Sequence, residues 1–247
     1  MAQPVCRGYQ CTSTDLIDAH IVPRGFARDV MGTYTSNRIV SIDKVRTTHH
    51  GVFDRGILCA GCDGKLGDLD NYALTVCRRF RHERIIRDDG LFELTSVDGD
   101  RFATFILSVL WRASVSTRIE VSKVSLGSYK ARAGEIIFGA KPLASLPDYQ
   151  LLVGRYLRTG KFNPAGNFTY PARMTRRLNG WYFALSGFRI LAKLDTAPLP
   201  AEIGPAVVNG NDRLIGSFMN YESTTEGQSV RAMAREAFVR DHTIAPR

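Results

Sequence analysis

The chain has 247 residues, enough for one large domain or two ordinary ones with a packed core. Hydrophobic residues make up 44% and charged residues 23%, which places it among globular proteins, and no apolar run is long enough to cross a membrane. The formal net charge of +9 favours a polyanionic partner such as nucleic acid, although a solvated basic surface explains it equally well.

The first residues lack the basic-then-apolar pattern of a signal peptide. We therefore expect a cytoplasmic protein that does not associate with a membrane. Thiols stay reduced in the cytoplasm, where paired cysteines bind metal more often than they form disulfides.

The composition changes near a turn at Asp88-Asp89-Gly90, where we expect a domain boundary. All five cysteines and every histidine except His242 precede this turn. We predict an α+β fold, with a zinc-binding domain over residues 1–90 and a mixed α+β domain over residues 91–247. The second domain would serve an accessory, regulatory or oligomerisation role.

In the first region, β-forming residues surround His20 over residues 15–22, and Pro23 with its neighbours ends that strand. A short strand or connection is expected over residues 38–45. Apolar residues then recur at three- and four-residue steps over residues 67–87, which predicts a helix. A short strand, a metal-binding knuckle and a helix follow one another in a treble-clef zinc module.

The second region shows the patterns of both helices and strands but no catalytic motif. Helical spacing predicts helices over residues 101–114 and 122–138, the latter interrupted near Gly127 and Gly134. Strands are expected over residues 149–157, 167–173 and 181–194, and a closing helix over residues 228–239.

Two cysteine pairs, Cys6 with Cys11 and Cys59 with Cys62, flank the strand of His20. A structural zinc site needs four soft ligands, which the fold usually supplies as two close pairs. A redox Cys-x-x-Cys motif would follow a strand of a thioredoxin-like βαβ unit, which is absent here. We therefore predict that these four cysteines bind a structural Zn²⁺.

The remaining thiol and two histidines are weaker candidates for this site. Cys77 falls in the predicted helix among apolar neighbours, so we interpret it as a core residue. His49 and His50 could replace one cysteine as ligands, but they lie in a polar stretch.

The order of these motifs resembles the HNH endonucleases, which belong to the ββα-metal (His-Me finger) nucleases. The resemblance covers roughly the first third of the chain. It is carried by the cysteine pair, the His20-Ile21-Val22-Pro23 stretch, and the Leu-Cys-x-x-Cys sequence before Asp63. A bacterial group of HNH-like proteins also carries a Leu-Trp-Arg-Ala-Ser run, matched here by residues 110–114.

The resemblance implies a metal-dependent endonuclease that cleaves phosphodiester bonds in DNA, with RNA as a possible substrate. His20 would be the general base, and Asp63 would bind a catalytic Mg²⁺ or Mn²⁺ through hard oxygen ligands. Asp54 lies at the family's middle position, which orients the histidine; a turn-forming Asp explains it equally well. Many relatives carry Asp where this chain has Ala19, and Asp18 could substitute because alternate residues of a strand share a face.

Basic residues follow the second cysteine pair. Lys65 is a candidate phosphate contact, and Arg78 and Arg81 belong to a basic helix face that could contact the DNA backbone or lie solvated. Nucleases of this family often act with a controlling partner in phage defence, so we expect a regulatory protein or a second copy of the chain. The alternative function is a catalytically inactive zinc treble clef that binds nucleic acid or protein.

Overall fold

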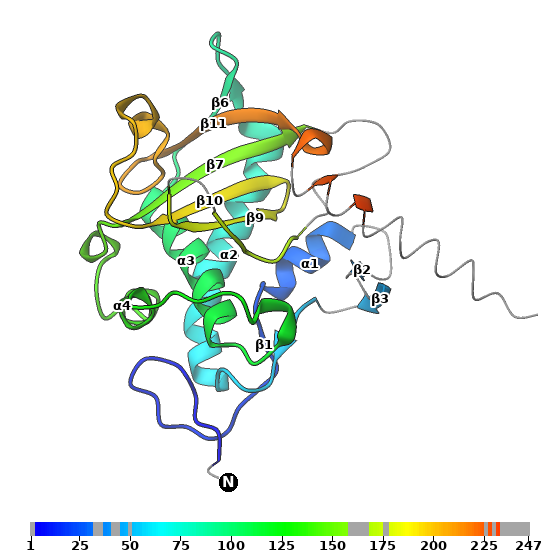
Figure 1. The fold of residues 1–247 in the computed structure, drawn as a ribbon, viewed down its shortest axis with the longest axis vertical. Helices are drawn as coiled ribbons and strands as arrows, with labels where there is room; N and C mark the ends of the chain where they lie inside the picture. Colours follow the sequence, from blue (N-terminus) through cyan, green and yellow to red (C-terminus); the bar gives the residue numbers. More distant parts are fainter. Residues whose placement is uncertain are drawn as a thin grey trace, which may run out of the picture.

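The computed structural model describes residues 3–31, 37–40, 45–48, 51–157, 168–174, 178–224, 227–228 and 231–232. The fold is mixed α+β, as predicted. A seven-stranded sheet packs against helices, and the cysteine-containing N-terminal segment lies at the far end of the longest helix (Figure 1). No helix within the described ranges is both long and apolar enough to span a membrane.

The strand that carries His20 is shorter than expected. β1 (Ala19–His20) pairs antiparallel with β4 (Phe53–Asp54), and Leu16 adds only an isolated bridge. The chain then enters α1 (Arg24–Met31), which the sequence analysis missed; Pro23 precedes it, a position where its fixed φ and missing N–H are tolerated. Of the predicted segment 38–45, residues 38–40 lie in β2 (Asn37–Val40) and residue 45 begins β3 (Val45–Thr48), which pairs with β2. Residues 41–44 lie outside the described residues.

The helix predicted over residues 67–87 begins earlier, at the second cysteine pair. α2 (Ala60–Glu83) follows directly after Cys59, whose extended backbone (φ −86°, ψ 166°) marks the helix start. Three glycines in its first turns hid this start from the hydrophobic pattern: Gly61, Gly64 and Gly67. The chain becomes extended again at Arg84 and forms β5 (Ile85–Ile86).

The helices of the second region differ in how well they were predicted. α3 (Gly99–Val115) confirms the helix expected over residues 101–114, and the Asp98 carboxylate caps it by accepting from the Arg101 N–H. The prediction of a helix over residues 122–138 is wrong for the first half of that range. Turns occupy that half, Gly127 has a left-handed φ of +52°, and α4 (Tyr129–Ile137) is the only α-helical part.

The large sheet has the order β5-β6-β11-β7-β10-β9-β8. Its further strands are β6 (Leu91–Thr95), β7 (Tyr149–Leu157), β8 (Ala172–Arg173), β9 (Gly180–Leu185), β10 (Phe188–Leu194) and β11 (Arg213–Asn220). β7 confirms the strand expected over residues 149–157. The segment 181–194 is a hairpin, because Ser186 and Gly187 both take positive φ and turn the chain. β6 and β11 were not predicted, and the expected helix 228–239 lies mostly outside the described residues.

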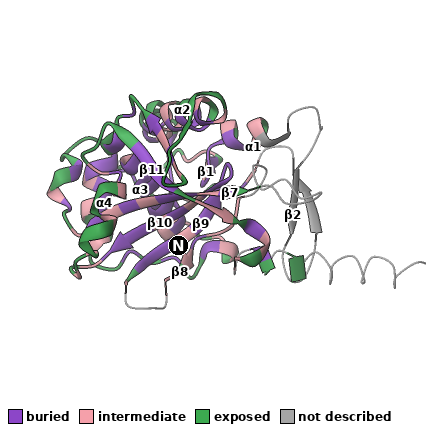
Figure 2. Ribbon diagram, turned by 90° about the horizontal axis from the view of Figure 1, so that it is seen from above, coloured by how far each residue is buried: buried purple, intermediate pink, exposed green. Residues whose placement is uncertain are grey.

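One hydrophobic core runs through both regions of the chain. Phe80 of α2 packs edge to face on Phe188 of β10, and Phe26 of α1 stacks on Phe105 of α3. Figure 2 shows the buried residues concentrated on the sheet and on the helices behind it. The two regions predicted from the sequence therefore share one core, and the turn at residues 88–90 joins the paired strands β5 and β6.

Candidate functional site

The four paired cysteines come together at the start of α2. The Sγ atoms of Cys6, Cys11, Cys59 and Cys62 all lie within 4.8 Å of one another. A tetrahedral zinc site with Zn–S bonds of about 2.3 Å places its sulfurs about 3.8 Å apart. The Sγ atoms of Cys11 and Cys59 lie 3.8 Å apart, so this donor set fits a metal such as zinc. Among the described residues, no other group of three or more His, Cys, Asp and Glu side chains is as close.

The backbone of the first knuckle is shaped around these sulfurs. The N–H groups of Gly8 and Cys59 donate to the Cys6 Sγ at 3.4 and 3.3 Å, and the Cys11 N–H donates to the Gly8 carbonyl at 3.1 Å. A Cβ on Gly8 would lie 2.4 Å from the Cys62 Sγ. Only glycine fits at this position.

The electrostatics of the cluster also favour a bound cation. The backbone N–H of Cys62 donates to the Cys59 sulfur and lowers the pKa of Cys59 to about 7. Burial raises the pKa of the Cys6 and Cys62 thiols. Four sulfurs this close can all ionise only when a cation shares their charge, which is the condition that a thiolate-bound metal satisfies.

The remaining cysteine and the alternative ligands do not join this cluster. Cys77 is buried in α2, and burial raises its pKa to about 12, so its interpretation as a core residue is confirmed. His49 and His50 lie outside the described residues.

His20 lies on β1, and Asp63 lies in the N-terminal half of α2. His20 of β1 faces Phe53 of β4 with ring centroids 6.0 Å apart, and Asp63 lies in the first turn of α2. Both are close enough to Asp70 to act on its pKa. Burial raises the pKa of Asp70, Arg112 opposes that rise, the charge of Asp63 adds to it, and His20 lowers it. Asp63 and Asp70 are seven residues apart, about two turns, and therefore lie on one face of α2.

Arg112 links this strand to the helix. Its side chain is only 1% exposed; Nη1 donates to the His20 carbonyl at 3.1 Å, and Nη2 donates to Asp70 Oδ1 at 2.5 Å and to Ser108 Oγ at 3.2 Å. The sequence analysis noted Arg112 only as part of the Leu-Trp-Arg-Ala-Ser run and assigned neither Arg112 nor Asp70 to the site. The available signal was a charged residue among the apolar positions of the helix predicted over residues 101–114.

Asp54 is held by the chain that follows α3. It is 5% exposed and accepts hydrogen bonds from the Gly56 N–H at 2.7 Å, the Ser116 hydroxyl at 2.6 Å and the Thr117 N–H at 2.7 Å. Burial raises the pKa of Asp54, but these donors outweigh it and hold the pKa below its usual value. Both carboxylate oxygens are thus engaged, which fits a residue that fixes the loop between β4 and α2.

The residues before His20 supply no evident ligand. Ala19 is completely buried. The carboxylate of Asp18 is bound by Arg55 in two hydrogen bonds of 2.5 and 3.3 Å at the surface. Of the acidic residues singled out from the sequence, Asp63 is therefore the one whose carboxylate can serve a metal ion.

The basic residues of α2 are spread along its length. Lys65 is exposed and lies two residues after Asp63. Arg78 lies 15 residues after Asp63, about 22 Å along the helix axis at about 1.5 Å per residue. Arg78 and Arg81 both bind Asp29 of α1, the first at 2.9 Å. The Arg78 side chain nevertheless keeps 56% of its surface exposed, more than the 32% of Arg81.

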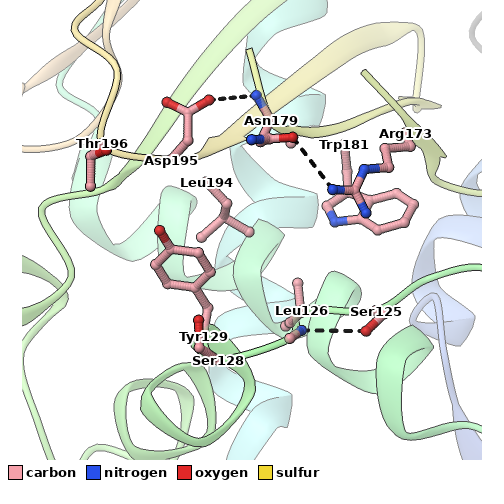
Figure 3. A pocket seen from close by; sticks show the side chains of 12 residues that line it. Ser125, Leu126, Ser128, Tyr129, Arg173, Asn179, Trp181, Leu194, Asp195 and Thr196 are labelled. Atoms are coloured by element: carbon pink, nitrogen blue, oxygen red, sulfur yellow. Dashed lines mark hydrogen bonds between the residues drawn. The ribbon is translucent and has the colours of Figure 1, made fainter. Parts of the chain in front are cut away.

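A pocket lies apart from these residues, where the start of α4 approaches β8, β9 and β10 (Figure 3). Its volume is about 380 Å³. Its charged groups pair within the protein, because Asp195 binds Lys193 and the Asn179 N–H, and Arg173 donates to the Asn179 side chain. None of the site residues predicted from the sequence lines it.

Comparisons with protein-family models, with curated proteins and with solved structures each found no significant match. The functional interpretation therefore depends on the residues themselves and on their geometry.

Proposed function

We propose that this chain is a zinc-stabilised, divalent-metal-dependent endonuclease of the HNH type that cleaves DNA. The observation that carries the proposal is the position of the cysteine cluster at the start of α2. From there α2 presents Asp63 in its first turn, and Arg112 ties the His20 backbone of β1 to Asp70, about two turns further along α2. Two antiparallel strands, a metal-binding knuckle and a helix are the parts that a ββα-metal or treble-clef module requires.

Each side chain has a role in this proposal. His20 would accept the proton of the attacking water, because an imidazole titrates near neutral pH. Asp63 would hold a Mg²⁺ or Mn²⁺ ion, which supplies charge stabilisation to the scissile phosphate and to the leaving oxygen. Asp54 would fix the loop before the second knuckle, and Lys65 would contact a neighbouring phosphate. None of the five cysteines is in a disulfide, which fits a reducing compartment, and we place the protein in the cytoplasm.

A second candidate function is favoured by one observation at the same site. Ala19 is buried and Asp18 is paired with Arg55, so of the acidic residues singled out from the sequence Asp63 alone is left to bind a catalytic ion. A zinc module that offers so few ligands to a catalytic ion could bind nucleic acid without cleaving it. In that case the exposed basic residues of α2, Lys65 and Arg78, would bind DNA with strong salt dependence.

Plasmid cleavage separates the two candidates. Purified wild-type protein, His20→Ala and His82→Ala are incubated with supercoiled plasmid and either Mg²⁺ or Mn²⁺. His82 is an exposed histidine near the other end of α2 and is the matched control. We expect His20→Ala to lose about 100-fold or more of the nicking rate, the contribution of a general base, and His82→Ala to retain it. Salt-sensitive DNA binding without cleavage by any of the three proteins would favour the inactive module.

A further inference from the structure

We propose that Arg112 is the positioning residue that sets the distance between the His20 strand and α2. The inference depends on the proposed function, since it deepens the account of the same site. The geometry behind it is one guanidinium that contacts the backbone of His20 on β1 and the carboxylate of Asp70 on α2.

The guanidinium suits this role because it is rigid and planar. Its two terminal nitrogens donate in fixed directions, so the His20 carbonyl and the Asp70 carboxylate are held at a fixed separation. A third donor contact, to the Ser108 hydroxyl, orients the side chain from its own helix at 3.2 Å. A lysine ammonium carries the same charge but has no such planar fork.

The burial of Arg112 argues against a role in stability alone. A buried ion pair gains little over well-packed apolar residues of the same volume, because both charges lose their hydration. The Nε–H of Arg112 also has no hydrogen-bond partner among the described residues. A net stabilising role would be served better by an apolar side chain, whereas fixed geometry at His20 requires the guanidinium.

The chain that follows Arg112 holds the partner strand of β1 in the same way. Ser116 and Thr117 donate to Asp54 of β4, and Nη1 of Arg118 donates to the Phe53 carbonyl at 3.3 Å. The end of α3 and the residues after it therefore contact both strands of the β1–β4 pair. Within this segment, Arg112 is the residue that connects the pair to α2.

The first test separates positioning from stability. The variants are Arg112→Lys, the double variant Arg112→Met with Asp70→Asn, and Lys193→Met as control. Lys193 is an equally buried cation, 3% exposed, paired with Asp195 at the end of β10. All are compared by urea denaturation, zinc content and single-turnover plasmid cleavage.

We expect Arg112→Lys to bind zinc and DNA as the wild type does but to cleave about 10- to 100-fold more slowly, because small displacements of a reacting group carry losses of this size. The double variant, which leaves no unpaired buried charge, should be as stable as the wild type but should cleave as slowly as Arg112→Lys or more slowly. Lys193→Met should lose stability and keep the cleavage rate of its folded fraction. If the double variant matched the wild type in both stability and cleavage rate, Arg112 would have a purely structural role and the inference would be overturned.

A second readout does not depend on activity. The Ile21 N–H donates to the Val52 carbonyl directly beyond His20, and its hydrogen exchange reports on the β1–β4 pair. We expect exchange at Ile21 to quicken about 10-fold or more in Arg112→Lys, with no change in β10. If the wild type does not cleave DNA, the proposed function fails, and this exchange measurement alone decides the positioning role. Unchanged protection at Ile21 would contradict it.

Discussion

The carbonyl oxygen of His20 accepts a hydrogen bond of 3.1 Å from Nη1 of Arg112, which lies 92 residues later in the chain. The strand proposed to carry the general base is thus held by a helix of the second region. Because the same guanidinium binds Asp70 of α2, the site is built from both halves of the sequence.

The four-cysteine cluster predicts the metal content of the protein. Purified protein should contain about one zinc ion per chain by elemental analysis, the stoichiometry of a four-cysteine site. Cys59→Ser should reduce that content strongly, since it removes a ligand from the cluster. Cys77→Ala is the matched control, because Cys77 is a buried thiol outside the cluster, and it should keep its zinc. Equal zinc loss in both variants would contradict the assignment.

Gly8 should be essential for the geometry of the site. Gly8→Ala would place a Cβ 2.4 Å from the Cys62 Sγ, so the sulfur has to move. Overpacking of this kind costs about 1–3 kcal/mol, and we expect zinc affinity in a chelator competition to fall about 10-fold or more. Gly64→Ala is the control: a Cβ there meets open space in α2, and stability should rise by about 0.5–1 kcal/mol. Unchanged zinc affinity in Gly8→Ala would contradict the close packing of Gly8 against the Cys62 sulfur.

Asp54 should contribute stability that depends on pH. Its pKa in the folded protein lies below the usual carboxylate value, so its contribution is present above about pH 4 and is lost as pH falls through the folded-state pKa. Asp54→Asn should cost about 2–3 kcal/mol in urea denaturation at pH 7, and the difference from wild type should shrink toward pH 3. Asp212→Asn, at a side chain 81% exposed, should change stability by less than about 0.5 kcal/mol at either pH. A difference for Asp54→Asn that does not change with pH would refute this assignment.

The exposed basic residues of α2 should appear in the salt dependence of DNA binding. Lys65→Ala and Arg78→Ala should each reduce the slope of log affinity against log salt concentration by about one, the effect of losing one phosphate contact. Arg81→Ala should affect stability more than binding, because Arg81 is less exposed and binds Asp29. Lys141→Ala, whose ammonium binds Glu135, is the control and should leave the slope unchanged. A slope that none of these changes affect would place the DNA on another surface.

Features set by local spacing were predictable from the sequence. The cysteine cluster and α3 follow from residue spacing within short windows, and the structure confirms both. The beginning of α2 was hidden because three glycines interrupt its first turns. β6 and β11 were missed because their apolar residues do not alternate strictly with polar ones, and the sheet that stabilises them is a tertiary property.

The contacts that complete the site join distant residues and leave no local pattern. Arg112 lies 42 residues from Asp70, and Ser116 lies 62 residues from Asp54. In the sequence Arg112 is one charged residue in an apolar helix, and Asp70 is one acid among several in α2. Their roles follow only from the packing of α3 against α2, which no periodicity within either helix specifies.

The most direct measurement is single-turnover DNA cleavage by His20→Gly with and without added imidazole. The glycine variant leaves space where the side chain of His20 stood, and free imidazole can take over proton acceptance from water. We predict that wild-type protein cleaves with Mg²⁺ or Mn²⁺, that His20→Gly does not, and that imidazole restores cleavage with a pH dependence near neutrality. Cleavage by His20→Gly at the wild-type rate, or no cleavage by the wild type with either metal, would contradict the proposed function.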